Sequence, residues 1–119
     1  MKKLLFSLPV FILLLFSCGE TSVDLASVDR VDGKVILKNQ DKPYSGQVEM
    51  FYENGNKKFQ ETLKNGTKDG KYLSYFKTGQ KKTEGKYING KRDGIWKWWN
   101  EKGEVSFQLD YSSNISLRF

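Results

Sequence analysis

A repeat with a period of 24 residues constrains the fold of this chain more than any other feature. Residues 46 to 111 divide without a gap into three units, 46–69, 70–93 and 94–111. Glycines recur at two fixed positions of each unit and an aromatic residue at a third: Gly46, Gly70 and Gly94; Gly55, Gly79 and Gly103; Phe51, Tyr75 and Trp99. A fixed period of this length indicates a repeat architecture.

Each unit predicts a β-hairpin. Asn54-Gly55, Asn65-Gly66 and Asn89-Gly90 are suited to type I′ turns, because Asn and Gly both tolerate a positive φ. Asp69-Gly70 and Asp93-Gly94 predict further turns at the joins between units. Val, Tyr, Phe, Trp and Thr dominate the intervening segments, as in β-strands. We therefore expect an all-β fold, an elongated antiparallel meander of tandem 24-residue hairpins.

Alternation along the first strand of each unit assigns its side chains to two faces. One face is expected to carry Val48, Met50 and Tyr52; Tyr72, Ser74 and Phe76; Trp96, Trp98 and Asn100. The other is expected to carry Gln47, Glu49 and Phe51; Lys71, Leu73 and Tyr75; Ile95, Lys97 and Trp99. Both faces hold aromatic residues, which fits a narrow sheet that buries a stripe on one side and leaves aromatic surface on the other.

The unit resembles the variant of the MORN repeat, the membrane occupation and recognition nexus. The resemblance rests on a glycine, an aromatic pair five and six residues later, an Asn-Gly turn, and the segment NGKRDG before the next aromatic strand. It covers roughly residues 43 to 111, and the segment Lys-Pro-Tyr-Ser-Gly of residues 42–46 resembles the lead-in that the family often has before its first full unit. It implies a MORN-like repeat array. Proteins with this variant often carry an antitoxin label, so the resemblance also implies an alternative function, inhibition of a toxin.

The N-terminus reads as a signal peptide, residues 1–17. Lys2 and Lys3 precede an apolar run that is too short to span a bilayer as a mature helix. The run ends in Leu-Phe-Ser before Cys18, which resembles a bacterial lipoprotein signal. That resemblance implies thioether lipidation of Cys18, cleavage before it, and acylation of its new amine, for example with palmitate. Gly19 is not the aspartate that retains such proteins in the inner membrane, so we expect an outer-membrane protein of the bacterial envelope.

Three further segments flank the repeats. Residues 18–30 are small and polar and predict a flexible tether. Residues 31–45 predict an N-terminal capping half-repeat, with a turn at Asp32-Gly33, because terminal units must close an exposed core. Residues 112–119 form a C-terminal tail that either pairs with the last unit or extends from it.

The composition bounds the chemistry. The formal charge of the 119-residue chain is +6, and removal of the signal leaves 18 basic and 14 acidic side chains, a charge of +4. There is no histidine, the commonest general base and metal ligand, and one cysteine, which allows no internal disulfide and no thiolate cluster. We therefore expect no cofactor and no metal. Scattered carboxylates without a deep cleft indicate that the protein is not an enzyme.

Aromatic residues give the candidate binding surface. Trp96, Trp98 and Trp99, together with Tyr72 and Tyr75, form an aromatic platform for a glycan, a lipid headgroup or a protein if they are exposed. The alternative is that these large side chains cover the open end of the sheet. Lysines that recur with the period, such as Lys57, Lys58, Lys81 and Lys82, either attract an anionic surface or protect edge strands from aggregation.

The sequence thus predicts a lipid-anchored envelope protein that binds or scaffolds a protein or a membrane surface and has no catalytic activity. The expected partners are the membrane, through Cys18, and an unidentified protein, envelope glycan or lipid. Nucleic acid is not expected for an exported protein. Exposed edge strands also leave self-association open.

Overall fold

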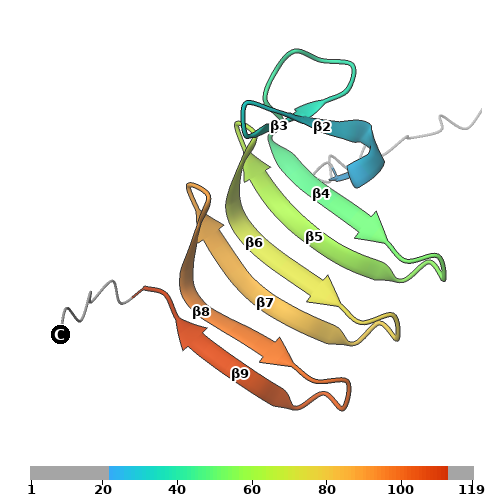
Figure 1. Cartoon of the computed structure of the whole chain (residues 1–119), viewed down its shortest axis with the longest axis vertical. Helices are drawn as coiled ribbons and strands as arrows, with labels where there is room; N and C mark the ends of the chain where they lie inside the picture. The colour runs from blue at the N-terminus through green and yellow to red at the C-terminus, as the bar shows by residue number, and fades with distance from the viewer. Residues whose placement is uncertain (1–21, 113–119) are drawn as a thin grey trace, which may run out of the picture.

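The structure is a computed structural model, and it describes residues 22–112. These residues form nine strands and one short 3₁₀ helix, so the predicted all-β fold is confirmed (Figure 1). The elements in chain order are β1 Ser22–Asp24, η1 Leu25–Ser27, β2 Val28–Val31, β3 Lys34–Leu37, β4 Gly46–Phe51, β5 Lys57–Lys64, β6 Thr67–Tyr75, β7 Lys81–Ile88, β8 Lys91–Trp99 and β9 Val105–Asp110. The signal peptide, Cys18 and residues 113–119 lie outside the described residues.

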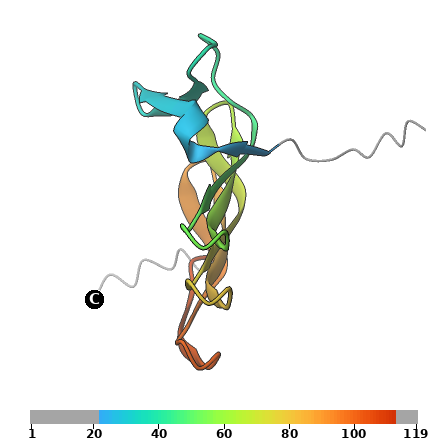
Figure 2. The same ribbon diagram turned by 90° about the vertical axis from the view of Figure 1, so that its right-hand side faces the viewer.

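Strands β4 to β9 form an antiparallel meander in which each strand pairs with the next along the chain. Strand β1 extends the sheet at its first edge by parallel pairing with β4, and β2 and β3 form a separate hairpin. Figure 2 shows the sheet nearly edge-on as one twisted layer, with the β2–β3 hairpin beside its first end. Within residues 22–112 the repeats therefore build a sheet that has no second layer along most of its length.

The prediction of a tether at residues 18–30 is wrong for residues 22–30. Val23 pairs with Val48 on β4, and Val28 pairs with Leu37 on β3. These apolar residues pack against a small core of Val35, Tyr44, Val48 and Leu63. The prediction of a tether rested on the many polar residues of this segment, although its few valines cover the end of the array.

Two kinds of turn alternate in the meander. Asn65 and Asn89 have φ near 50° and precede glycines with positive φ, as a type I′ turn requires, so these two predictions are confirmed. The turn at Asn54-Gly55 differs from its prediction, because Asn54 does not have a positive φ. There the Gly55 amide donates to the Tyr52 carbonyl at 3.0 Å and the Tyr52 amide to the Asn56 carbonyl at 2.8 Å. This is the longer hairpin loop in which one glycine takes the left-handed conformation.

The predicted turns at Asp69-Gly70 and Asp93-Gly94 are wrong, because both pairs lie inside strands, β6 and β8. Gly70 and Gly94 have φ of 122° and 63°, and the pairing register shifts beside each of them. Each pair therefore forms a bulge instead of a turn. Asp69 has a further role, since its carboxylate accepts the amide of Asn89 in the following turn at 3.3 Å.

The predicted alternation of faces is confirmed by the pairing register. Val48, Glu61, Tyr72 and Gly85 are successive cross-strand partners on one face, which we call the aromatic face. A second row on the aromatic face contains Met50, Phe59, Ser74, Thr83, Trp98 and Phe107. The opposite face carries the row Glu49, Gln60, Leu73, Glu84, Lys97 and Gln108.

Candidate functional site

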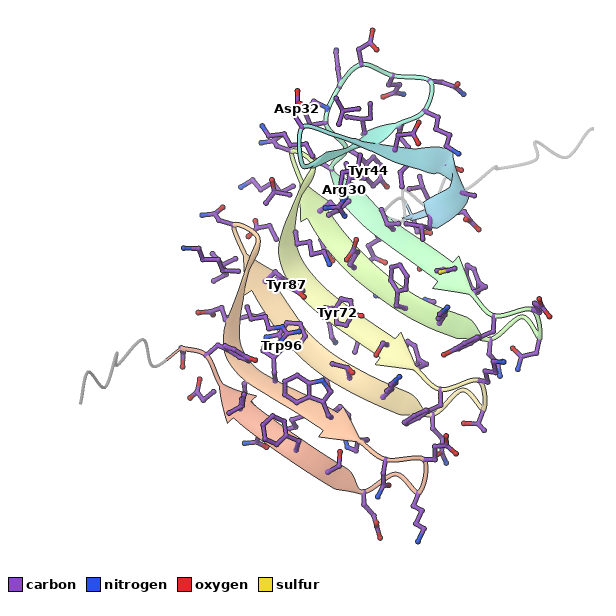
Figure 3. The ribbon with its side chains drawn as sticks, viewed as in Figure 1. Arg30, Asp32, Tyr44, Tyr72, Tyr87 and Trp96 are labelled. Atoms are coloured by element: carbon purple, nitrogen blue, oxygen red, sulfur yellow. The ribbon has the colours of Figure 1, made fainter. Side chains whose placement is uncertain are left out.

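A continuous stack of rings crosses the aromatic face. The ring centroids of Phe59 and Tyr72 lie 6.5 Å apart, and those of Tyr72 and Trp96 lie 5.6 Å apart with nearly parallel planes. The stack continues from Trp96 to Trp98 at 6.0 Å and from Trp98 to Phe107 at 5.3 Å. Figure 3 shows Tyr72, Tyr87 and Trp96 on neighbouring strands in the middle of the sheet. These rings supply, side by side, the burial that a second layer supplies in other sheets.

Trp96 is the most buried residue of this stack, with 1 % of its surface exposed. Its indole covers Gly85, and its N–H donates to the Lys86 carbonyl at 3.1 Å. Trp96 therefore cannot contribute to an exposed binding platform, and its predicted place on the candidate binding surface is wrong. Because Gly85 on the neighbouring strand β7 has no side chain, the Trp96 ring can lie flat on the sheet.

The other four predicted surface residues are half-buried and lie on two different faces. Tyr72 and Trp98 belong to the aromatic face, whereas Tyr75 and Trp99 lie on the opposite face beside Lys81. The structure therefore does not bring the five candidates together into one platform. Adjacent residues of a strand point in opposite directions, so the pair Trp98-Trp99 was bound to be divided.

Two cations cover the rings at the equivalent position of successive units. The Arg92 guanidinium lies 4.8 Å from the Trp96 ring centroid and donates to the Tyr111 hydroxyl at 3.0 Å. Hydrogen bonds from Arg92 to Tyr111 and Tyr87 raise the pKa of this guanidinium above its ordinary value. One unit earlier, Lys68 lies 5.0 Å from the Tyr87 ring centroid. Both side chains shield the stack from water while their charges stay at the surface.

Lys68 also neutralises a buried carboxylate. Glu61 is 6 % exposed, and its Oε2 forms an ion pair with Lys68 Nζ at 2.9 Å. Tyr72 packs beside this pair, and burial raises the pKa of its phenol. A paired carboxylate and a protonated phenol form a satisfied structural cluster, because a buried charge needs such a partner.

The paired lysines at the start of β5 and β7 divide their roles in the same way. Lys57 forms an ion pair with Glu49 at 3.1 Å, and Lys81 forms one with Glu84 at 3.0 Å. The second lysine of each pair lies over an aromatic ring instead, Lys58 over Tyr52 and Lys82 over Phe76, both at 5.5 Å. In each of these two lysine pairs one lysine forms an ion pair, and the other lies over a ring and forms no ion pair with residues 22–112.

The last strand is the feature that the predicted binding surface missed. All six residues of β9 are exposed, including Val105 at 53 %, Phe107 at 52 % and Leu109 at 42 %. Within residues 22–112 no strand pairs with the outer edge of β9. Strand β9 contains no lysine, a property that it shares with β1 and β4, whereas β5 to β8 each contain at least two basic residues. Lysine commonly protects edge strands from pairing with other chains.

The described part of the chain shows no cluster of acidic, cysteine or histidine side chains suited to a metal ion. Among residues 22–112 there is also no helix of the length and apolarity needed to cross a bilayer.

A family model described as the MORN repeat variant matches residues 44–65, 68–89 and 92–112. No curated protein and no solved structure matches the chain. The three matched segments follow one another with the period of the hairpins, and together they span more than half of the sequence.

Proposed function

The chain belongs to the MORN repeat variant family, and from this premise we propose that it is a lipid-anchored, non-catalytic binding protein of the bacterial envelope. MORN repeats are generally associated with protein or membrane binding and are typically non-catalytic. The proposed anchor is Cys18, and the proposed location is the outer membrane.

The exposed strand β9 is the observation that carries the proposal, and it favours a protein partner. Among residues 22–112 no strand pairs with the backbone donors and acceptors of its outer edge, and Phe107 and Leu109 continue the rows of the aromatic face into solvent. An extended segment of a partner protein can pair with such an edge and bury these side chains, as in β-strand addition. A membrane surface is less well suited to β9, because anionic lipids require cations and β9 has none.

Site-specific crosslinking tests the proposal. The full-length protein, with a photoreactive phenylalanine analogue in place of Gln108, is irradiated in its native envelope. The matched control carries the same analogue in place of Gln60, which lies on the same row of the opposite face but in the interior strand β5. We expect one discrete protein adduct from position 108 and none from position 60.

A charged variant distinguishes specific binding from chance contact. Phe107→Lys with Leu109→Lys places two cations on an already exposed strand and so opposes strand addition. Thermal unfolding checks that the fold survives the loss of the ring contact between Trp98 and Phe107. The adduct should disappear in this variant. Equal adducts from both positions, or an adduct that survives in the charged variant, would contradict the proposal, and an adduct of twice the protein's own mass would identify self-association as the scaffolding mode.

The lipid anchor has a separate test. Growth with an alkyne-bearing palmitate should label the wild-type protein, and Cys18→Ser should abolish the label and release the protein from the membrane fraction. A variant that keeps both the label and the membrane location would exclude Cys18 as the anchor.

A further inference from the structure

A recess of about 250 Å³ opens on the aromatic face over strands β5 to β7. Its floor is the middle of the row of paired residues that begins with Met50, at the cross-strand pair Ser74 and Thr83. Phe59 and Tyr72 stand beside this pair. The recess lies away from the outer edge of β9, so a ligand in the recess and a protein partner on β9 would bind independently of each other.

A comparison of the three 24-residue units shows why there is a recess at this place. Ser74 stands at the same position of its unit as Met50 in the first unit and Trp98 in the third. Thr83 occupies the position of Phe59 and Phe107. Large side chains fill the row on both sides, and two small hydroxyl-bearing residues interrupt it in the middle. Thr83 is 7 % exposed and belongs to the lining of the recess.

Two un-neutralised cations line the recess. Lys58 and Lys82 both border it. Each ammonium rests over an aromatic ring at 5.5 Å, and neither takes part in an ion pair among residues 22–112, in contrast to the preceding lysines, Lys57 and Lys81. The 24-residue period places this pair of charges one unit apart on either side of Ser74.

We propose that this recess binds one acidic sugar residue of an anionic polysaccharide. Aromatic rings accept the apolar C–H face of a sugar, the hydroxyls of Ser74 and Thr83 can exchange hydrogen bonds with its hydroxyls, and Lys58 and Lys82 attract its carboxylate. The recess is smaller than the pockets of about 300–1,000 Å³ that hold drug-sized ligands, which suits a single monosaccharide unit. Its open mouth lets the remainder of the polymer continue on both sides.

Calorimetric titration of the full-length protein in a neutral detergent tests the proposal, with tetragalacturonate as the anionic probe and maltotetraose as the neutral one. Tetragalacturonate should bind at one saturable site, and maltotetraose at least about tenfold more weakly, because hydrogen bonds to charged groups are lost. No binding of tetragalacturonate by the wild-type protein would overturn the proposal.

Two pairs of lysine substitutions separate a specific site from general attraction. Lys58→Gln with Lys82→Gln should weaken binding of tetragalacturonate at least about tenfold. Lys57→Gln with Lys81→Gln removes the same charge from ion-paired lysines and should change the affinity less than about twofold. Equal weakening by both pairs would show nonspecific charge attraction and overturn the proposal.

A filled recess provides the second variant. Ser74→Trp introduces the residue that the next unit already carries as Trp98, so the sheet has a precedent for accommodating it. The variant should unfold at nearly the wild-type temperature and lose tetragalacturonate binding. Retained binding of tetragalacturonate by Ser74→Trp would overturn the proposal. The proposal would also be overturned if the wild-type protein bound phosphatidylglycerol vesicles but not tetragalacturonate, and Ser74→Trp lost the binding to vesicles.

Discussion

The indole of Trp96 occupies the space that a side chain on Gly85 would need. A Cβ atom added at Gly85 would lie 2.2 Å from Trp96 Cδ2, well inside the contact distance of two carbon atoms. Gly85 does not have a positive φ, so its backbone would accept alanine and the obstacle is the ring alone. The most buried aromatic residue of the sheet thus depends on one glycine of the neighbouring strand.

Gly85→Ala should therefore destabilise the protein by about 1–3 kcal/mol, the usual cost of overpacking. Urea denaturation measures the change. The double variant Gly85→Ala with Trp96→Leu should cost less than the sum of the two single variants, because the smaller side chain relieves the clash. Strict additivity of the two single changes would contradict this account of the contact.

Trp96→Ala should cost about 3–5 kcal/mol, because it empties a fully buried site between strands. Trp99→Ala should cost only about 1 kcal/mol, because Trp99 is half-buried and lies on the opposite face. Thermal unfolding of the two variants checks the order. A larger loss from Trp99→Ala would show that the opposite face carries more of the stability.

Asn89→Val should destabilise the type I′ turn by about 1–2 kcal/mol, because a β-branched residue is strained at φ of 49°. Asn89→Gly relieves this strain and should stay close to the wild type. Urea denaturation of both variants gives the comparison. Similar losses for valine and glycine would mean that the side chain of Asn89, and not its backbone conformation, stabilises the turn.

The pKa of the Glu84 carboxyl lies below its ordinary value, chiefly because the Lys81 ammonium donates a hydrogen bond to it. A pKa that is lower in the folded than in the unfolded protein means that this pair stabilises the fold above the unfolded-state pKa. The stabilisation disappears as the pH falls through the folded-state pKa. NMR titration should show that Lys81→Gln raises the pKa of Glu84 and that Lys82→Gln leaves it unchanged, and an equal rise in both variants would refute the specific contact.

The sequence predicted the strands of the repeats, the two faces and two of the three type I′ turns, because these depend on local alternation and on the conformations of Asn and Gly. It could not predict that Trp96 lies over Gly85. A regular two-residue hairpin at Asn89-Gly90 would place Thr83 opposite Trp96. The bulge at Gly94 shifts the register by two residues, so Thr83 pairs with Trp98 instead. The Asp-Gly pairs that looked like turns are the source of that shift.

Residues 22–30 escaped prediction for a related reason. Val23 and Val28 become partly buried only through their tertiary contact with the core beside β4, and no local sequence pattern predicts that contact. The candidate surface failed because aromatic content identifies large side chains without showing which of them are buried. The lack of lysine in β9 is visible in the sequence, but β1 and β4 lack basic residues as well, so the sequence alone does not single out β9 as the exposed edge.

The one-layer construction has a mechanical consequence. Within residues 22–112 each interior strand of the meander hydrogen-bonds only to its two neighbours, and the ring contact of Tyr72 with Trp96 joins β6 to the next strand but one, β8. Stability therefore comes chiefly from contacts between nearby strands and not from one core that all strands share. In the part of the chain that the structure describes, β1 pairs with β4 and the β2–β3 hairpin packs beside the first end of the sheet, whereas β9 pairs with a strand on one side only. A force applied to the C-terminus should therefore separate the sheet one strand at a time, beginning with β9. The strands next to β4 should be the last to separate.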